Sequence, residues 1–219
     1  MREARVTIVP KTGSDADLRS EFDRQVDTLI LRGYPKLAGL QEHVFLRQMS
    51  PLEERLPGLS ASGEEGHIAF VIVVGSELVP PDKAMPLVEL GGEAGFTTME
   101  ADDLEQFTSV KSVKRPDGPA YLVGDVDTGR GTLNVRPDEA IQTIARESRS
   151  PLTIDEGVAL ITHHPEVLKT RNCFSMLGSR CGDRRVTAMW ISEGRPRLGW
   201  CWAGNRHTWL GSASCLSRA

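Results

Sequence analysis

The run IAFVIVV at residues 68–74 decides the fold class of this chain. It is continuous, apolar and rich in β-branched residues, a pattern typical of a strand that is covered on both faces. We therefore predict a central strand here. A second apolar run at residues 120–126 lies between Pro119 and a turn at residues 127–129, and this pattern predicts another strand.

Two amphipathic helices are predicted before the first strand. One begins at Ser14 or Asp15, carries apolar residues at spacings of three and four, and ends at Gly33. The next spans residues 40–49 and stops before Pro51, because the residue that precedes a proline avoids the helical conformation.

Two further helices are predicted after the second strand. Pro137 occupies the first position of one, which ends near Arg149. The other begins with a capping-box pattern from Thr153 to Glu156, and Pro165 ends or kinks it.

These elements predict an α/β protein of the α+β kind. We expect a mixed β-sheet with the N-terminal helices packed on it and a C-terminal antiparallel β-meander. No repeat or linker divides the chain, so residues 1–219 are predicted to form a single domain. Within it we expect a helical part at 10–57, an α/β part at 67–168 and an antiparallel β part at 172–215.

Composition and the N-terminal residues indicate a globular protein in the cytoplasm. Hydrophobic residues make up 39% of the chain and charged residues 26%, which argues against a disordered or fibrous protein. Residues 1–10 lack the apolar core of a signal peptide, and the longest apolar run is far shorter than the roughly 20 residues that cross a bilayer. We therefore expect no membrane contact.

Charge is distributed unevenly along the chain. Residues 161–219 carry nine Lys or Arg and three Asp or Glu, a net charge of +6. The whole chain has a net charge of −4, so the remaining residues together carry −10. A basic segment can attract an anionic ligand, or it can face the acidic part of its own chain. The sequence leaves both interpretations open.

The loop GSRCGDRR at residues 178–185 is the best candidate for a ligand-binding loop. Its glycines let backbone amides approach a ligand, and its arginines supply planar donors for carboxylate or phosphate. The alternative is a surface turn in which Asp183 pairs with an arginine. The candidate binding residues here are Arg180, Asp183, Arg184 and Arg185.

The last strands are predicted to gather aromatic rings on one face. A two-residue turn at Gly204-Asn205 would pair Trp202 with His207, and a five-residue loop at 193–197 would place Trp190 opposite Trp200. Residues that oppose one another share a face, so all four tryptophans and His207 would lie together. This face is either core or a stacking platform for a ligand.

The residues nearest that turn complete the predicted site. Trp202 and His207 are expected to reach an edge or pocket, and Asn205 lies with them at the tip. The site requires that this tip and the basic loop lie together around an open hollow.

Histidines and cysteines give secondary candidates. His163 and His164 close the capping-box helix, where they either bind a ligand or simply end the helix. Cys181 or Cys201 could serve as a nucleophile beside a histidine, and otherwise they are buried thiols.

No cofactor is identified, and a zinc site is the weakest alternative. Its four ligands would be Cys173, Cys181, Cys201 and His207, but the close Cys-x-x-Cys pairs of zinc ribbons are missing. We predict no metal ligands. The aspartates of DVDTG at residues 125–129 resemble those of haloacid-dehalogenase-type phosphatases, but the residues that follow are in the wrong order and we reject that motif.

Several strings resemble an actinobacterial family catalogued only as a domain of unknown function, family 5701. They are PLTIDEG (151–157), THHP (162–165), GSRCGDRR (178–185), LGWCWAGN (198–205) and, near the N-terminus, EFDRQVDTLI (21–30) and GYPKLAGL (33–40). The resemblance implies one compact unit in a cytosolic bacterial protein. It brings no assigned activity.

We therefore expect a small-molecule-binding protein, either a simple binder or an enzyme, whose anionic and partly aromatic ligand meets the C-terminal Arg/Trp/His cluster. The alternative is a non-catalytic protein-interaction or regulatory module that docks an acidic partner. Nucleic-acid binding comes third, because the net charge is negative and no known module is visible.

Overall fold

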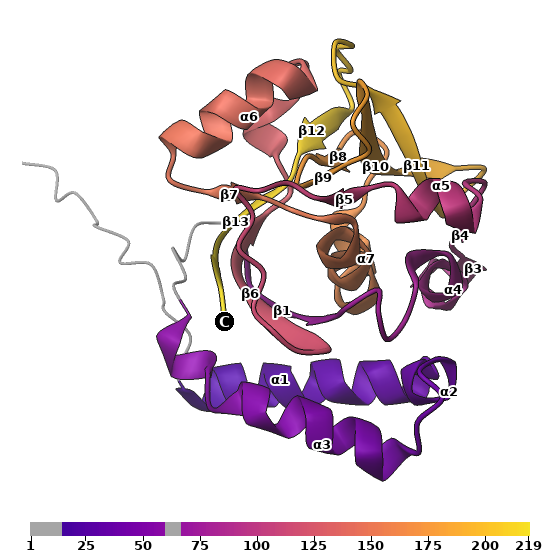
Figure 1. The fold of residues 1–219 in the computed structure, drawn as a ribbon, viewed down its shortest axis with the longest axis vertical. Helices are drawn as coiled ribbons and strands as arrows, with labels where there is room; N and C mark the ends of the chain where they lie inside the picture. The colour runs from indigo at the N-terminus through magenta and orange to yellow at the C-terminus, as the bar shows by residue number, and fades with distance from the viewer. Residues whose placement is uncertain (1–14, 60–66) are drawn as a thin grey trace, which may run out of the picture.

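Two β-sheets with a helix between them form the centre of the molecule (Figure 1). The computed structural model describes residues 15–59 and 67–219. Ser14 and the segment 1–10 used to exclude a signal peptide lie outside these residues. The helices are α1 (Asp15–Leu31), α2 (Tyr34–Leu37), α3 (Glu42–Glu53), α4 (Pro81–Ala84), α5 (Ala101–Glu105), α6 (Pro137–Arg146) and α7 (Ile154–His163), with short 3₁₀ turns at Leu56–Gly58, Met85–Leu87, Arg130–Thr132 and Pro165–Val167.

The first sheet is antiparallel throughout, and the second is mixed. The first has the order β1 (Ile68–Val74), β6 (Ala120–Asp127), β13 (Ser214–Arg218) and β7 (Ser150–Pro151). The second has the order β12 (Leu210–Ser212), β8 (Cys173–Met176), β10 (Arg185–Ser192), β11 (Arg195–Trp202) and β4 (Phe96–Thr97). Two short ladders join β2 (Glu89–Leu90) to β3 (Glu93–Ala94) and β5 (Thr108–Ser109) to β9 (Ser179–Arg180).

The predicted fold class is confirmed. The fold is mixed α+β, helices α1 to α3 pack beneath β1 and β6, and β8, β10 and β11 form an antiparallel meander (Figure 1). The capping box at the start of α7 is also present, with the Thr153 hydroxyl and the Glu156 carboxylate each bonded to the other residue's backbone N–H.

The prediction that β1 is a central strand is wrong, because β1 lies at the edge of its sheet. Its residues 70–74 are nevertheless buried, since α1 and α7 cover it. The buried Gln25 of α1 donates its amide to the Phe70 carbonyl at 3.0 Å and accepts from the Ile72 N–H at 2.7 Å. His163 Nε2 of α7 lies 2.9 Å from the Ile72 carbonyl. Side chains thus replace the neighbouring strand.

Helix α7 lies between the two sheets, and nearly all of its residues are buried. The helix approaches β8 closely only because residue 157 is glycine. A Cβ atom at Gly157 would lie 1.9 Å from the Met176 Sδ atom. This packing fixes α7 against the second sheet.

Helix α3 does not stop before Pro51 as predicted, but continues through it to Glu53. A proline inside a helix costs one hydrogen bond and roughly 3 kcal/mol. Met49 and Leu52 are both buried in the core on either side of it. Their burial offsets the cost of the proline in the last turn.

The predicted register of the C-terminal hairpin is also wrong. Glu193 and Gly194 form a two-residue turn with φ of 54° and 78°, so the five-residue loop does not form. Trp190 therefore pairs with Arg197, and Trp200 pairs with Thr187. Because an odd shift of register moves residues to the other face, Trp190 lies on the opposite face from Trp200 and Trp202.

The predicted turn at Gly204-Asn205 does not join paired strands. The strand that follows, β12, lies parallel to β8 and not beside β11. Trp202 and His207 are therefore not cross-strand partners.

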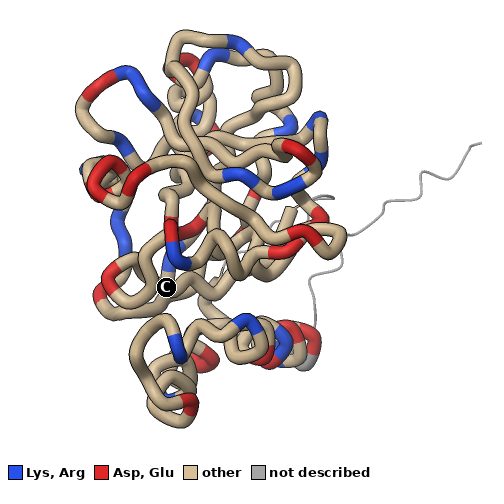
Figure 2. The backbone as a smooth tube through the Cα atoms, turned by 90° about the vertical axis from the view of Figure 1, so that its right-hand side faces the viewer, with Lys and Arg blue, Asp and Glu red and all other residues tan. Residues whose placement is uncertain are grey.

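Acidic and basic residues are interspersed along the backbone (Figure 2). Three arginines of the basic C-terminal segment pair with acids from earlier in the chain, namely Arg185 with Asp103, Arg206 with Glu139 and Arg218 with Glu156. The basic segment therefore faces the acidic part of its own chain at these three places.

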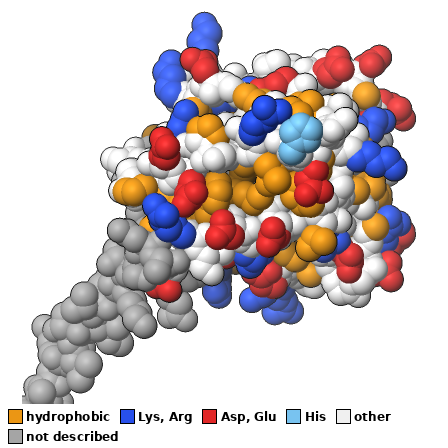
Figure 3. Space-filling model, turned by 90° about the horizontal axis from the view of Figure 1, so that it is seen from below, with side chains coloured by type: hydrophobic (Ala, Val, Ile, Leu, Met, Phe, Trp, Pro, Cys, Tyr) orange, Lys and Arg blue, Asp and Glu red, His pale blue; other side chains and the backbone are white. Residues whose placement is uncertain are grey.

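The underside of the molecule is formed by the N-terminal helices. Hydrophobic side chains lie there between charged ones (Figure 3), and Leu31, Leu37 and Leu46 are exposed. Across residues 15–59 and 67–219, no helix combines the length and apolar character that a bilayer crossing needs.

Candidate functional site

The predicted basic loop lies beside the segment that carries Gly204. The Ala203 N–H donates to the Arg184 carbonyl at 2.8 Å. A Cβ atom at Gly204 would lie 2.5 Å from Arg184 Nη2, so the guanidinium packs directly on this glycine. Arg184 forms no ion pair with any described residue. The structure therefore brings these two parts of the predicted site together.

The other charged residues of the loop bind one another. Asp183 accepts from the Arg185 backbone N–H at 2.7 Å, from the Cys181 thiol at 3.1 Å and from Arg185 Nε at 2.8 Å, and these bonds lower the pKa of Asp183 to about 2. Arg180 Nη2 donates to the Asp183 carbonyl at 3.0 Å. Asp183 thus organises a turn.

The aromatic residues of the predicted site separate into two groups. Trp200 and Trp202 are 38% and 47% exposed, and their rings meet edge to face with centroids 5.1 Å apart. His207 instead packs on Trp209, also at 5.1 Å, and its Nε2 atom is buried without a partner among the described residues. Asn205 closes a turn by donating its N–H to the Trp202 carbonyl.

The secondary candidates do not gather into a site. His163 is buried, and its burial lowers the pKa to about 3, so the ring is neutral and supports β1. His164 lies 3.3 Å from Glu21 at the other end of α7 from the capping box. Burial raises the pKa of the Cys201 thiol to about 12 and also raises that of Cys181, which leaves both thiols protonated at neutral pH.

The four residues considered as zinc ligands do not form a cluster. Within the part of the chain that the structure describes, no three His, Cys, Asp or Glu side chains lie together as metal ligands would. Cys173 and Cys215 are buried free thiols, and Cys181 and Cys201 are partly buried ones.

A cleft of about 590 Å³ opens elsewhere, between α4, α5 and the N-terminus of α7. None of the predicted binding residues lines it. Its wall combines apolar and polar side chains from Ser76, Glu77, Pro80, Pro81, Asp82, Lys83, Ala101, Leu104, Glu105, Phe107, Thr108, Ser109, Arg115, Thr153, Ile154, Asp155 and Ser179. This mixture is typical of small-molecule sites.

Asp155 is the polar residue of this wall with the most unusual environment. It is the second residue of α7, and its side chain is 11% exposed. The Ser76 N–H donates to Oδ2 at 3.0 Å, and Arg115 Nη1 donates to the same oxygen at 3.3 Å. Burial raises the pKa of the carboxyl to about 6, although the bonds from Ser76 and the charge of Arg115 act to lower it.

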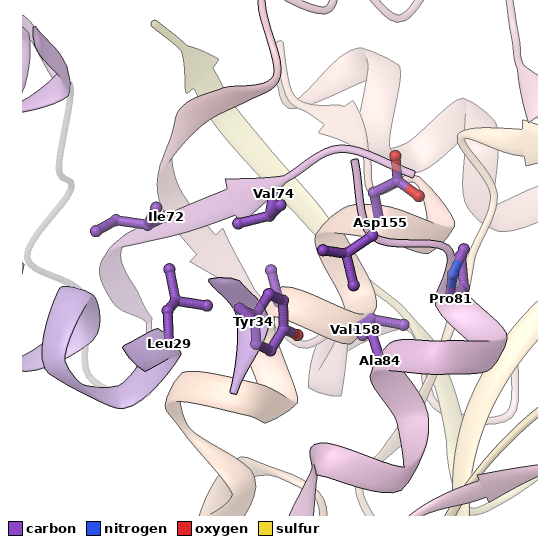
Figure 4. A pocket seen from close by; sticks show the side chains of 10 residues that line it. Leu29, Tyr34, Ile72, Val74, Pro81, Ala84, Asp155 and Val158 are labelled. Atoms are coloured by element: carbon purple, nitrogen blue, oxygen red, sulfur yellow. The ribbon is translucent and has the colours of Figure 1, made fainter. Parts of the chain in front are cut away.

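The cause of this burial is visible behind Asp155. A pocket of only about 10 Å³ is lined by side chains of α1, β1, α4 and α7, and Asp155 stands at its edge (Figure 4). The carboxylate oxygens point away from Leu29 and Tyr34. The stem of Asp155 thus lies among apolar groups. A carboxyl with this pKa can exchange a proton near neutral pH.

A second buried network holds the start of α7 in place. Glu156 accepts from Arg218 Nε at 2.5 Å and Nη2 at 2.8 Å, and from the Tyr121 hydroxyl at 3.1 Å. Glu156 also accepts from the Thr153 N–H as part of the capping box. Because these groups are all buried, they position the first turn of α7, and with it Asp155.

The predicted loop contributes to the cleft indirectly. Arg185 binds Asp103 of α5 at 2.8 Å, and its guanidinium lies 5.4 Å from the ring of Phe107 and 5.6 Å from that of Trp200. Phe107 lines the cleft, so Arg185 connects the cleft wall to the exposed tryptophans. The loop also supplies Ser179, whose hydroxyl accepts from the Ile154 N–H at 3.0 Å.

The aspartates of the rejected phosphatase motif are bound by protein groups. Asp125 Oδ1 lies 2.8 Å from His67 Nδ1 and 2.7 Å from Arg149 Nη1, and Asp127 accepts from the Gly129 N–H. Asp125 adopts φ of 52°, which is rare for a residue with a side chain. This cluster joins β6 to β13 through Arg149 and Ser214.

A comparison with known protein families matches residues 28–219 to a family of unknown function, DUF5701. The chain belongs to this family. The match covers both sheets and every residue that lines the cleft. No curated protein and no solved structure matches this DUF5701 chain.

One local signal in the sequence points to this site. The capping box placed Asp155 in the first turn of a helix, where carboxylates are favoured. Its partners, Ser76 and Arg115, lie 79 and 40 residues away along the chain, so only the folded structure shows their contact.

Proposed function

We propose that this protein binds a small molecule in the cleft between α4, α5 and the N-terminus of α7. The observation that carries the proposal is the position of Asp155, a shielded carboxyl on the wall of a 590 Å³ cleft. A shielded carboxyl with a perturbed pKa in a concave, mixed surface is a candidate for a functional site. Because Asp155 can exchange a proton, the bound molecule is also a candidate for acid–base chemistry.

The walls of the cleft support a preformed site. Asp155 is fixed by Ser76 and Arg115, and its helix is fixed by the buried Glu156 network. Phe107 and Leu104 supply apolar surface, and both are themselves packed in the core. Rigid walls lower the entropic cost of binding.

A cleft-filling variant tests this proposal. A small-molecule library is screened by thermal shift, and each hit is tested again on Ser109→Trp, which places an indole in the cleft. Ser50→Trp, an exposed position on α3, is the matched control. We expect Ser109→Trp alone to abolish stabilisation by the hits. Hits that stabilise both variants equally would contradict the proposal.

A second candidate site is the C-terminal cluster, for an anionic and partly aromatic ligand. The contact of Arg184 with Gly204 and the exposure of Trp202 favour it. The hits that survive Ser109→Trp are tested on Arg184→Ala and His207→Ala. Loss of stabilisation in these two variants would assign the ligand to this cluster.

The origin and location of the protein also remain proposals. We infer an actinobacterial protein of the cytoplasm from the strings that resemble family 5701. Fractionation of a native host would show the protein in the cytoplasmic fraction, and its recovery in another fraction would contradict this inference.

A further inference from the structure

The cations of the cleft are already bound to carboxylates. Arg115 Nη2 donates to Glu77 at 2.6 Å, Nη1 donates to Asp155 at 3.3 Å, and the guanidinium lies 5.7 Å from the Tyr121 ring. Lys83 pairs with Asp82 at 3.0 Å and is 65% exposed. Arg115 is therefore engaged by two carboxylates, and the charge of Lys83 is balanced by its neighbour Asp82.

Carboxylates outnumber cations on the cleft wall. The acids are Glu77, Asp82, Glu105 and Asp155, and the bases are Lys83 and Arg115. Glu105 has no ion pair with any described residue. The cleft therefore carries a negative balance, and it attracts cations more strongly than anions.

Asp155 and the apolar wall define how a ligand would lie. Oδ2 of Asp155 already accepts from Ser76 and Arg115, whereas Oδ1 accepts from none of the described residues. The carboxylate is shielded from water, so a cation placed beside Oδ1 would replace lost hydration. Leu104, Phe107 and Pro81 also line the cleft and supply apolar contacts. A ligand that satisfies both the carboxylate and these residues has one charged end and an apolar body.

We propose that the ligand of this cleft is a small organic cation, an amine or amidine with an apolar body whose charged group binds Asp155. The proposal rests on the proposed function, because it names the class of molecule that the same cleft takes. It differs from the anionic ligand expected from the basic C-terminal segment. The reason is that the cleft draws its charges from other parts of the chain.

Three probes of one shape test the class of ligand. Benzylamine is protonated at neutral pH, benzyl alcohol is neutral, and benzoate is anionic. Binding of each to the full chain is measured by titration with ligand-observed NMR at pH 7.5. We expect benzylamine to bind roughly tenfold more tightly than the other two, which is the effect of one charge-assisted hydrogen bond.

Variants of single acids locate the effect. Asp155→Asn should remove the preference for benzylamine, so that the three probes bind about equally. Asp23 is an exposed acid on α1, and Asp23→Asn should leave the preference unchanged. If Asp155→Asn does not fold, Glu77→Gln is used instead: it removes one negative charge from the cleft wall and should reduce the preference for benzylamine over benzoate. Ser109→Trp should abolish binding of all three probes.

The outcomes separate the two proposals. If benzoate or benzyl alcohol binds as tightly as benzylamine and Ser109→Trp abolishes the binding, the cleft is a ligand site, but the proposal of a cationic ligand is wrong. If benzylamine binds but Ser109→Trp or Asp155→Asn has no effect, the amine lies elsewhere and the inference is overturned. If no probe binds in a manner sensitive to Ser109→Trp, both proposals fail.

Discussion

At the scale of single residues, the buried carboxyl of Asp155 is expected to lower the stability of the fold at neutral pH. Its pKa rises from an ordinary 3.8 to about 6 on folding, so the folded chain takes up a proton at higher pH than the unfolded chain. Stability from this group is therefore lost as the pH rises from about 4 to about 6. Groups held at such a cost are typical of binding and catalytic sites.

This linkage predicts that Asp155→Asn stabilises the protein at pH 7.5. We expect a gain of about 1–2 kcal/mol in the free energy of unfolding, less than the full pKa shift corresponds to, because the polar amide of Asn is also buried at a cost. Near pH 4 the gain should vanish. Urea unfolding at the two pH values measures it, and a loss of stability at pH 7.5 would contradict the assignment.

At the scale of elements, local patterns predicted the strand and helix positions well. The strand at 68–74 and the capping box of α7 were found because burial on both faces and reciprocal hydrogen bonds each leave a local pattern. The edge position of β1 was not predicted. The side chains that replace a neighbouring strand, Gln25 and His163, come from distant parts of the chain, so no local pattern shows them.

Turn chemistry decided the hairpin register. The turn at Glu193-Gly194 places a glutamate at positive φ. Among residues with a side chain, Asn and Asp adopt this conformation most readily, so a glutamate is unusual at this position of a type I′ turn. The turn residues predicted at Gly204-Asn205 fit a hairpin better, but β12 pairs with β8 instead. The aromatic face was misplaced as a result.

The protected edge of β1 gives a prediction at the same scale. Gln25→Leu keeps the side-chain volume but leaves the Phe70 carbonyl and the Ile72 N–H buried without a partner. We expect a loss of about 2–4 kcal/mol in the free energy of unfolding. Urea denaturation measures this loss.

Gln48 on α3 provides the matched control. Its Oε1 atom is buried without a partner among the described residues, so Gln48→Leu should be neutral or stabilising. Equal destabilisation by the two substitutions would show that the Gln25 hydrogen bonds do not protect the edge.

At the scale of the whole molecule, the candidate site depends on contacts that join distant segments. The sequence drew attention to the basic C-terminal segment, where charge and rings cluster along the chain. In space several of those arginines are bound to acids, and Arg185 supports α5 and Phe107 at the cleft. The cleft is lined by residues from several segments between positions 76 and 179, and no local sequence pattern predicts that these segments meet.

The same long-range logic predicts how the fold responds to the loss of Arg218. This residue of β13 is 5% exposed, and its guanidinium binds the Glu156 carboxylate, Ser150 Oγ and the Pro151 carbonyl, so it joins the last strand to β7 and to the cap of α7. Arg218→Ala leaves Glu156 as an uncompensated buried charge, which typically costs about 3–5 kcal/mol. We therefore expect a large fall in the urea midpoint.

Arg206→Ala is the control, because Arg206 is exposed and its pair with Glu139 lies at the surface. It should change stability little. Adding Glu156→Gln to Arg218→Ala removes the unpaired charge while keeping an acceptor for the Thr153 N–H, so the double variant should recover part of the lost stability. If the double variant is less stable than Arg218→Ala alone, the cost does not come from the buried charge, and the network does not hold Asp155 in place by electrostatics.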